Sequence, residues 1–486
     1  MQFWRVKSLD DILASAERKA LTRTLGAFQL TMLGIGAIIG TGIFVLTAEA
    51  ATKAGPAMMI SFIIAATVCA LAALCYAEMA SMVPVSGSAY TYSYATMGEI
   101  VAWVVGWALV LEYAVAASAV SVGWSGYMVG LVRELFGIVI PQALTNGPFD
   151  KVPGIVNLPA LLIALVVTVL LIVGTKESAR FNTVLVMIKI SALVLFIALA
   201  IPALNAENFQ PFMPNGFFAR EVMDPITGNM MTVGVTAAAA SIFFAYVGFD
   251  AVSTAAEETI NPQRNIPIGL IGSLALCTVI YLLVAAGAIG AVGAAPGGEL
   301  STSKEALAYV LREIGHGWAG DLLAIAAGLA LPSVILIMMF GQTRIFFVMA
   351  RDGLLPSVFA KLHPKYGTPH IVTMCTGVFV ALFAALFPVG ALADISNSGT
   401  LFAFATVAIG VMILRRTQPD RPRSFRTPLV WLIAPVAAAG CVFLFFQLSG
   451  YTELLFFIWA AIGLVIYGLY GYRKSHVGQP HLIPTE

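Results

Sequence analysis

Two glycine-interrupted apolar stretches, far apart in the chain, carry the residue types best suited to chemistry. The first runs from Gly34 to Gly42 (GIGAIIGTG) and the second from Phe243 to Asp250 (FFAYVGFD). Each lies in the middle of a segment long enough to cross a bilayer as a helix. Because lipid offers no hydrogen-bond partners, such a helix can break only where the freed backbone lines a cavity or holds a ligand. Two breaks in corresponding places therefore point to a solute-binding site.

The freed backbone groups at the breaks are suited to the opposite ends of a dipolar solute. A half-helix that starts after a break offers N–H groups and a partial positive charge, so Gly40, Thr41 and Gly42 are candidates for binding a carboxylate. A half-helix that ends at a break offers carbonyls to an ammonium group. The candidates for that role are Ile38, Phe244, Ala245 and Val247. A zwitterionic amino acid fits this pair of clamps.

Simpler explanations exist for the same residues. Glycine-rich apolar helices often pack closely against their neighbours, and the Thr41 hydroxyl could donate back to its own helix. Phe244 could close over a solute as an outer gate, or it could pack between helices as most of the 30 phenylalanines must. The position of the second break favours the binding site, because it corresponds to the first.

Three ionisable residues, Glu112, Lys189 and Asp250, lie inside apolar segments, where a charge is costly. Lys189 could supply a positive charge without a bound sodium ion, and it could take up and release a proton because burial disfavours the charged form. This predicts proton coupling; the alternative is an ammonium that snorkels to the headgroups. Glu112 and Asp250 could hold a proton, pair with Lys189 or balance a cationic substrate, and Asp250 could instead cap freed N–H groups.

The elements that position these residues are membrane-spanning helices. The chain is 59% hydrophobic and only 10% charged, whereas an average soluble domain is roughly one quarter charged. Twelve segments are apolar over the length of about 20 residues that a bilayer requires. They run near 27–50, 57–82, 99–132, 157–174, 182–203, 232–257, 267–292, 319–349, 372–390, 394–414, 428–449 and 451–472. Glu78, Glu257 and Glu258 fall near segment ends, where we expect them to be solvated.

Lysine and arginine set the expected orientation. With the N-terminus inside the cell, nineteen of them lie on the cytoplasmic side and six outside, so both termini are predicted to be cytoplasmic. Segments 1 and 6, the broken ones, then cross in opposite directions, which makes the second set of five an inverted copy of the first. The predicted parts are a cytoplasmic N-terminal segment 1–26, a first five-helix repeat 27–203, an inverted repeat 232–414, helices 11 and 12 at 428–472, and a cytoplasmic tail 473–486.

Several function classes lack their signatures in this sequence. The five cysteines show no CxxC spacing and the five histidines lie outside the apolar segments, so neither a metal site nor a cofactor is expected. No phosphate loop or nucleophile elbow occurs, which argues against an enzyme. The arginines form no basic stripe that could bind nucleic acid.

Five stretches together make the chain resemble the amino acid–polyamine–organocation (APC) superfamily, and within it the bacterial relatives of the cationic amino acid transporters. They are Gly34–Phe44, Phe243–Glu258, Gly341–Pro356, Pro84–Tyr90 and Ser396–Phe404. The resemblance implies an all-α membrane protein with 12 transmembrane helices. These form a LeuT-type 5+5 inverted repeat in which helices 1 and 6 are broken, with two additional C-terminal helices. It also implies alternating access in a bacterial inner membrane.

The same resemblance implies roles for residues named above. The carboxylate and amine clamps are those at the two breaks, Phe244 is the outer gate, and Lys189, Glu112 and Asp250 are the proton-coupling positions. The partners are then an amino acid, protons and membrane lipids. The expected function is proton-coupled import of L-amino acids, and the alternative is an amino acid exchanger of the same fold. A channel would need a continuous polar path, which the apolar segments do not offer.

The eighth segment should line the side-chain pocket with Leu331, Ser333 and Val334, and Pro332 should kink it. A buried cationic side chain without a carboxylate partner would be costly. Apolar bulk in this segment therefore favours neutral amino acids, while cationic ones remain possible through Glu112 or Asp250.

Overall fold

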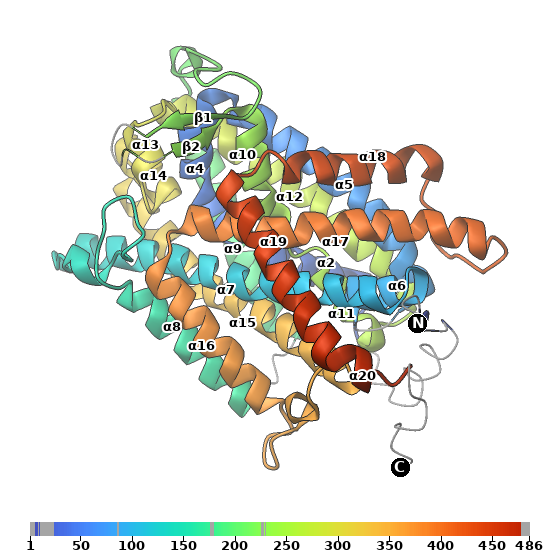
Figure 1. Ribbon diagram of the computed structural model, residues 1–486. Helices are drawn as coiled ribbons and strands as arrows, with labels where there is room; N and C mark the ends of the chain where they lie inside the picture. The colour runs from blue at the N-terminus through green and yellow to red at the C-terminus, as the bar shows by residue number, and fades with distance from the viewer. Residues whose placement is uncertain are drawn as a thin grey trace.

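The computed structural model describes residues 5–7, 9, 24–84, 87–174, 179–224, 228 and 230–477, and this part of the chain is a bundle of long helices (Figure 1). Among the described residues, eight helices are long and apolar enough to cross a membrane, and four shorter apolar helices accompany them. Each of the twelve predicted segments overlaps one of these helices, while the twelve-crossing, five-plus-five arrangement remains a prediction. Most of the predicted segment 1–26 and of the tail 473–486 lies outside the described residues.

Helices account for most of the first half of the described chain. In order they are α2 (Ala27–Ile38), α3 (Thr41–Phe44), α4 (Leu46–Ala54), η1 (Gly55–Ala57), α5 (Met58–Met82), α6 (Ser88–Thr96), α7 (Glu99–Phe136), η2 (Gln142–Leu144), α8 (Leu158–Val173), α9 (Ala179–Ala200), η3 (Ile201–Ala203) and η4 (Ala206–Phe209). A two-stranded antiparallel hairpin follows, formed by β1 (Arg220–Met223) and β2 (Met230–Val233).

The second half begins with another interrupted segment. The elements of the second half are, in order, α10 (Val235–Ile242), η5 (Phe243–Tyr246), α11 (Ala251–Thr254), η6 (Ala256–Glu258), α12 (Pro262–Val292), α13 (Glu299–Thr302), α14 (Ala306–Glu313), α15 (Gly317–Arg351), η7 (Ser357–Ala360), α16 (His370–Leu386), α17 (Val389–Thr417), α18 (Val430–Phe445), α19 (Gly450–Ile466), η8 (Tyr467–Gly471) and α20 (Tyr472–Lys474). The long helix α7 packs along α15 and α17, and α2 lies along α12.

Both interrupted segments break where glycines fall. The first leaves the α-helical conformation at Ile39, and the helix resumes at Thr41. The second has no α-helix between Ile242 and Ala251. Within it, Gly248 has a φ of +116°, and a Cβ there would lie 2.9 Å from the backbone carbonyl of Ala37. A side chain at this position would be both strained and obstructed, so the two breaks pack backbone to backbone.

The two ends of the described chain meet at one end of the bundle. The Arg5 guanidinium lies 5.0 Å from the centre of the Tyr472 ring. Lys7 forms a 2.9 Å ion pair with Asp352, next to the C-terminal residues. This is the end that the charge count assigns to the cytoplasm. It also holds Glu78, which is fully buried and accepts two hydrogen bonds from Arg415, at 2.7 and 2.8 Å.

The expectation that Glu78 is solvated is therefore wrong. A carboxylate at the end of an apolar segment can be buried if an arginine from a distant part of the chain reaches it with two parallel hydrogen bonds. Glu258 is partly exposed, as expected, and the side chain of Glu257 is not among those that the structure describes.

Candidate solute-binding site

The two breaks meet around a closed cavity in the middle of the bundle. Its volume is about 10 Å³, near the lower limit for one water molecule, so a solute must widen it. The residues around it that the sequence predicted are Ile38, Gly40, Thr41, Gly42, Phe244, Val247 and Val334. The remaining lining residues, which sequence reasoning missed, are Ala37, Val120 and Met338. Val120 and Met338 belong to α7 and α15, whose rotation about their own axes decides which side chains face inward.

Three predicted residues lie beside this cavity without lining it. Ala245 packs against Gly42 through its backbone. Leu331 is fully buried in α15, and the Ser333 hydroxyl donates to the Ala330 carbonyl at 2.7 Å in its own helix. In this closed arrangement, Val334 and Met338 are therefore the residues of α15 that face the cavity.

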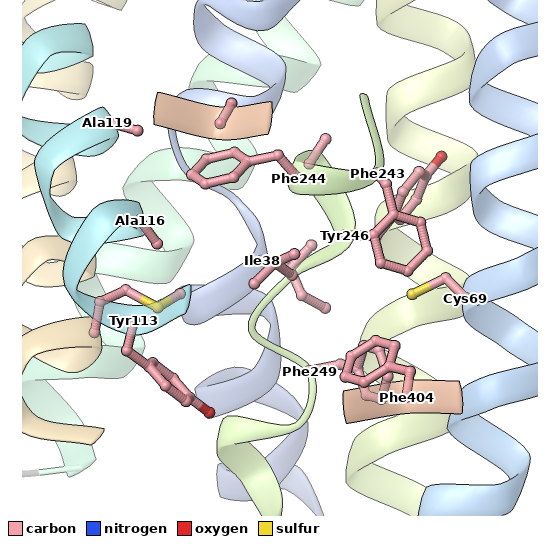
Figure 2. Packing of buried hydrophobic residues seen from close by; sticks show 14 of the residues in the cluster. Ile38, Cys69, Tyr113, Ala116, Ala119, Phe243, Phe244, Tyr246, Phe249 and Phe404 are labelled. Carbon is pink, nitrogen blue, oxygen red and sulfur yellow. The ribbon is translucent and has the colours of Figure 1, made fainter. Parts of the chain in front are cut away.

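Phe244 and its neighbours point to opposite sides of the break. Figure 2 shows the Phe244 ring directed toward Ala119 of α7, whereas Phe243 and Tyr246 point toward α5 near Cys69. Phe243 makes an edge contact with Phe404, the two ring centres lying 5.9 Å apart. The Phe244 ring thus lines the cavity, while its neighbour packs into the core.

Thr41 is buried, and its side chain has no hydrogen-bond partner among the described residues. The alternative in which Thr41 donates back to its own helix is not what the structure shows. Its position after the break also leaves first-turn N–H groups without partners within the helix. On the other side of the break, the Ile38 carbonyl accepts a 2.9 Å hydrogen bond from the Tyr281 hydroxyl. The buried Thr41 hydroxyl, for which the described residues offer no partner, costs free energy, and a bound hydrogen-bond acceptor would recover that free energy.

Lys189 reaches the first break from α9. It is fully buried, and its ammonium donates a 2.7 Å hydrogen bond to the carbonyl of Gly36, in the last turn of α2. The alternative in which Lys189 snorkels to the headgroups does not match this geometry. The ammonium instead connects α9 to the half-helix that precedes the break.

Glu112 and Asp250 form a second buried polar group. The Tyr113 hydroxyl donates to one carboxylate oxygen of Asp250 at 2.5 Å. The other Asp250 oxygen and both Glu112 carboxylate oxygens are buried, and within the described part of the chain none of them has a hydrogen-bond partner. Two ionised carboxylates are costly in such surroundings, and a carboxyl group that keeps its proton avoids that cost.

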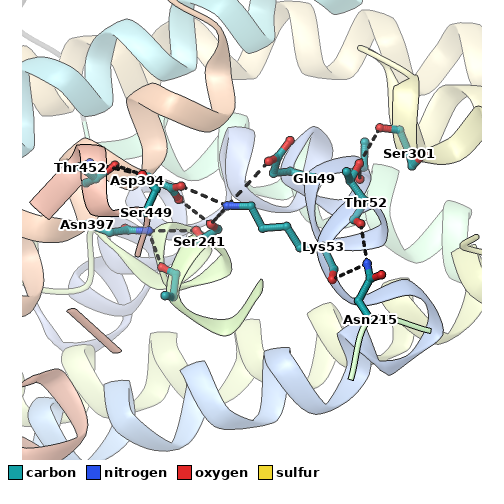
Figure 3. Close-up of polar contacts among 12 residues, drawn as sticks. Glu49, Thr52, Lys53, Asn215, Ser241, Ser301, Asp394, Asn397, Ser449 and Thr452 are labelled. Carbon is teal, nitrogen blue, oxygen red and sulfur yellow. Dashed lines mark hydrogen bonds and ion pairs between the residues drawn. The ribbon is translucent and has the colours of Figure 1, made fainter. Parts of the chain in front are cut away.

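A buried ionic network closes the bundle at the end opposite to Arg5 and Tyr472. Lys53, one of the six basic residues counted above on the outer side, belongs to the last turn of α4 and is 7% exposed. Its ammonium lies 3.1 Å from Asp394 of α17 and 3.7 Å from Glu49, and it also donates to Ser241 of α10 (Figure 3). Asn397 donates to the Ser241 carbonyl at 2.9 Å. We call these five residues the outer network; it joins α4, α10 and α17.

A larger cavity lies on the other side of the closed site. Its volume is about 540 Å³, and its lining includes Leu33 of α2, Asn182 of α9, Phe340 of α15 and, at its inner limit, Tyr113. The cavity thus reaches Tyr113, whose hydroxyl donates to the buried carboxyl group of Asp250. A second cavity of about 480 Å³, lined by Val122, Glu305 and Arg312 among others, lies on the side of the predicted outer loops.

We expect Lys53→Met to open the outer side. Removing one partner of a buried ion pair leaves an unpaired charge and costs about 3–5 kcal/mol, so the closed state should lose stability relative to an outward-open one. The measurement is the rate at which an impermeant thiol reagent, added outside cells, labels a cysteine placed at Val120. We expect labelling at least about tenfold faster than with Lys53 intact.

The matched control is Lys304→Met. Lys304 also pairs with an aspartate, Asp150 at 2.8 Å, but its side chain is 47% exposed, and surface pairs contribute about 0–1 kcal/mol. Its labelling rate should not change. Equal rates in the two variants would show that the outer network does not hold the closed state.

A family model and several known proteins match most of this chain. A family model described as amino acid permease matches residues 25–470. The branched-chain amino acid permease BcaP of Bacillus subtilis (strain 168) is 46% identical over 480 residues, which cover 98% of this chain and 99% of that protein. The methylthioribose transporter of the same organism is 43% identical over 473 residues, or 97% and 98% of the two chains. A vacuolar cationic amino acid transporter 4 of Arabidopsis thaliana is 35% identical over 402 residues, which cover 82% and 64%.

Proposed function

Since this chain belongs to the amino acid permease family, we propose that it imports neutral, branched-chain L-amino acids across a bacterial inner membrane by alternating access, coupled to protons. The observation that carries the proposal is the buried Thr41 hydroxyl, which lacks a partner at the break in the first interrupted segment. Around it the cavity offers apolar side chains and freed backbone groups. The relative named as a branched-chain amino acid permease supports the choice of side chain.

In this proposal the two ends of the amino acid bind to different breaks. The carboxylate accepts hydrogen bonds from Thr41 and from the N–H groups that follow Gly40 and Gly42, where a carboxylate is stabilised by the helix dipole. The ammonium donates to carbonyls near Ile38 and in the Phe244–Val247 turn. Every α-amino acid shares these two groups, so the clamps select α-amino acids as a class and do not discriminate between their side chains.

The side-chain pocket is formed by Val120, Val334 and Met338, which are apolar. A guanidinium or ammonium buried against them would lack an ionic partner, which costs far more than the burial of an aliphatic chain. Branched aliphatic side chains gain instead from the removal of apolar surface from water. Phe244 closes over the bound solute, and the outer network seals the path above it.

Proton coupling is assigned to Lys189, Glu112 and Asp250. The Lys189 ammonium is bonded to Gly36, beside the carboxylate clamp, and the Asp250 carboxyl group accepts a hydrogen bond from Tyr113, which lines the large cavity. A proton that moves onto or off these groups therefore changes the charge next to the moving half-helices. An amino acid exchanger of the same fold would need no such change.

The relative that transports methylthioribose provides the second candidate substrate. A thiosugar has hydroxyl groups but neither a carboxylate nor an ammonium group, so it would use only part of the two clamps. We therefore rank it below the branched-chain amino acids, and the experiment below includes it.

A binding screen on the purified protein tests the substrate. A ligand that binds only the folded state raises the apparent melting temperature by mass action, so leucine, isoleucine and valine should raise it, and arginine and methylthioribose should not. Uptake of the active ligand into proteoliposomes should then depend on an inward proton gradient. Stabilisation by methylthioribose alone would contradict the amino acid proposal, and pH-independent uptake that internal amino acid stimulates would identify an exchanger.

Thr41→Val tests the carboxylate clamp within the same system. It keeps the shape of the side chain but removes the hydroxyl, so we expect the KM for every transported amino acid to rise about tenfold, the effect of one lost charge-assisted hydrogen bond. Thr41→Ser keeps the hydroxyl and is the control, with little change. A change for one amino acid but not for others would place Thr41 at the side chain instead of the carboxylate.

A further inference from the structure

The large cavity offers a track of side chains along α15 from the closed site toward the predicted cytoplasmic surface. Val334 lines the closed site, and Leu336, Phe340, Arg344 and Phe347 line the large cavity. Arg344 lies ten residues after Val334, which is about 15 Å along the helix. A solute the size of an amino acid cannot contact both positions at once, so anything that binds at Arg344 occupies a separate site.

Two charged residues, Arg344 and Glu258, line this cavity, and the rest of its described lining is uncharged. They come from α15 and η6 and form an ion pair at the wall of the cavity, with 3.5 Å between the guanidinium and the carboxylate, and their side chains are 29% and 35% exposed. An ion pair with this length and exposure contributes little to stability. A ligand that satisfies both charges can therefore replace this contact between the two side chains.

The guanidinium of Arg344 and the backbone of Glu258 are held in place before any ligand arrives. The Arg344 guanidinium lies 3.9 Å from the centre of the Phe340 ring, a stacking arrangement that fixes the plane of the group. The backbone of Glu258 is anchored as well, because its carbonyl accepts hydrogen bonds from the N–H groups of Thr24 and Leu25, at 2.9 and 3.0 Å. Groups fixed in this way lose little freedom on binding, which favours recognition.

We propose that Arg344 and Glu258 form a second binding site for the amino acid zwitterion, occupied as it moves between the closed site and the cytoplasm. Its carboxylate binds the planar guanidinium through two parallel hydrogen bonds, and its ammonium binds the carboxylate of Glu258. The site rests on the proposed function, since it is a station for the same substrate class. It recognises the zwitterion and no particular side chain, because both charged contacts go to groups that every α-amino acid shares.

The test compares transport from the two faces of the membrane. Uptake into whole cells gives the KM at the outer face, and uptake into everted membrane vesicles gives the KM at the predicted cytoplasmic face. Arg344→Gln should raise the second KM about tenfold and leave the first unchanged, for every transported amino acid. Arg344→Lys, which keeps the charge but loses the planar fork, should have an intermediate effect. Glu258→Gln should act as Arg344→Gln does.

Arg351→Gln is the matched control, because Arg351 is an exposed arginine at the end of the same helix; we expect no change at either face.

If Arg344→Gln and Glu258→Gln alter the maximal rate equally at both faces and leave both KM values unchanged, the pair is only a contact between helices and the second site is refuted. A Glu258→Arg/Arg344→Glu double variant restores the ion pair without the guanidinium stacked on Phe340. Membrane levels that recover while the cytoplasmic KM stays high support the site, and a restored KM shows that the pair is only a contact between helices. If the wild-type protein transports no amino acid, the proposed function itself has failed, which the wild-type arm shows separately.

Discussion

We expect Gly42→Ala to abolish transport while the protein still reaches the membrane. A Cβ at Gly42 would lie 2.3 Å from the Cα of Ala245 and 2.7 Å from its Cβ. The obstructing Cα belongs to the backbone, so no side-chain rotation relieves the contact, and the two breaks must move apart. Since the proposed clamps for the carboxylate and the ammonium sit on opposite breaks, this displacement separates them. A misplacement of about 1 Å at a reacting site can cost about 100-fold in rate, and we expect a loss of at least that size in uptake.

Gly317→Ala is the control for this prediction. Gly317 is the first residue of α15, and a Cβ there has no heavy atom within 4 Å. An alanine should be tolerated or slightly stabilising, because alanine is the better helix former by up to about 1 kcal/mol. Membrane levels measured by immunoblot separate a transport defect from a folding defect. Uptake by Gly42→Ala with an unchanged KM would mean that the two breaks need not touch, which would contradict the site.

The breaks could be predicted from sequence because lipid imposes a strict condition on the backbone. A glycine cluster in the middle of an apolar segment leaves few explanations, and the two clusters indeed meet in space. The contact between Gly248 and Ala37 shows the reason in atomic terms. The apolar segments could be predicted for the same reason, since a spanning helix needs a long run of apolar residues.

The charged contacts between distant parts of the chain could not be predicted in this way. Lys53 and Asp394 are 341 residues apart, and each looks like an ordinary charge at a segment end. Glu78 was misjudged for the same reason, because Arg415 lies 337 residues further along. Local patterns indicate where a charge sits in a segment, but not which charge of another segment will reach it.

The lining of the closed site illustrates a second limit. The sequence predicted that the eighth segment would contribute side chains, and Val334 does face the cavity. Ser333 does not, because one residue along a helix turns the side chain by about 100°. Leu331 shares the face of Val334, but it lies one turn earlier along α15, outside the lining of the cavity. Met338, one helical turn after Val334, takes their place. A hydrophobic helix that is buried on most sides carries no polarity pattern from which its rotation could be read.

Lys189→Ala should abolish accumulation of substrate against a gradient while binding persists. The variant removes the ammonium that donates to Gly36, and with it the group proposed to change charge beside the first break. The substrate clamps at Thr41 and Phe244 keep their own backbone positions. The unpaired Gly36 carbonyl costs about 1–3 kcal/mol, but the free and the bound states share this cost. The Kd measured from ligand-induced stabilisation should therefore change by no more than about threefold. The measurements are proton-driven accumulation in proteoliposomes and counterflow of amino acid without a gradient. Counterflow should survive and accumulation should not.

The control for that variant is Lys361→Ala, an exposed lysine after η7, which should accumulate substrate as the wild type does. Full accumulation by Lys189→Ala would transfer the coupling role to Glu112 and Asp250, the buried carboxyl groups next to Tyr113. The distinction has a physical basis, because a proton on Lys189 acts directly on α2, whereas a proton on Asp250 acts on the segment just before α11. Loss of counterflow together with accumulation would contradict the coupling role. It would show that the ammonium holds the first break in its conformation, since a half-helix without that hydrogen bond could no longer present Thr41 to the substrate.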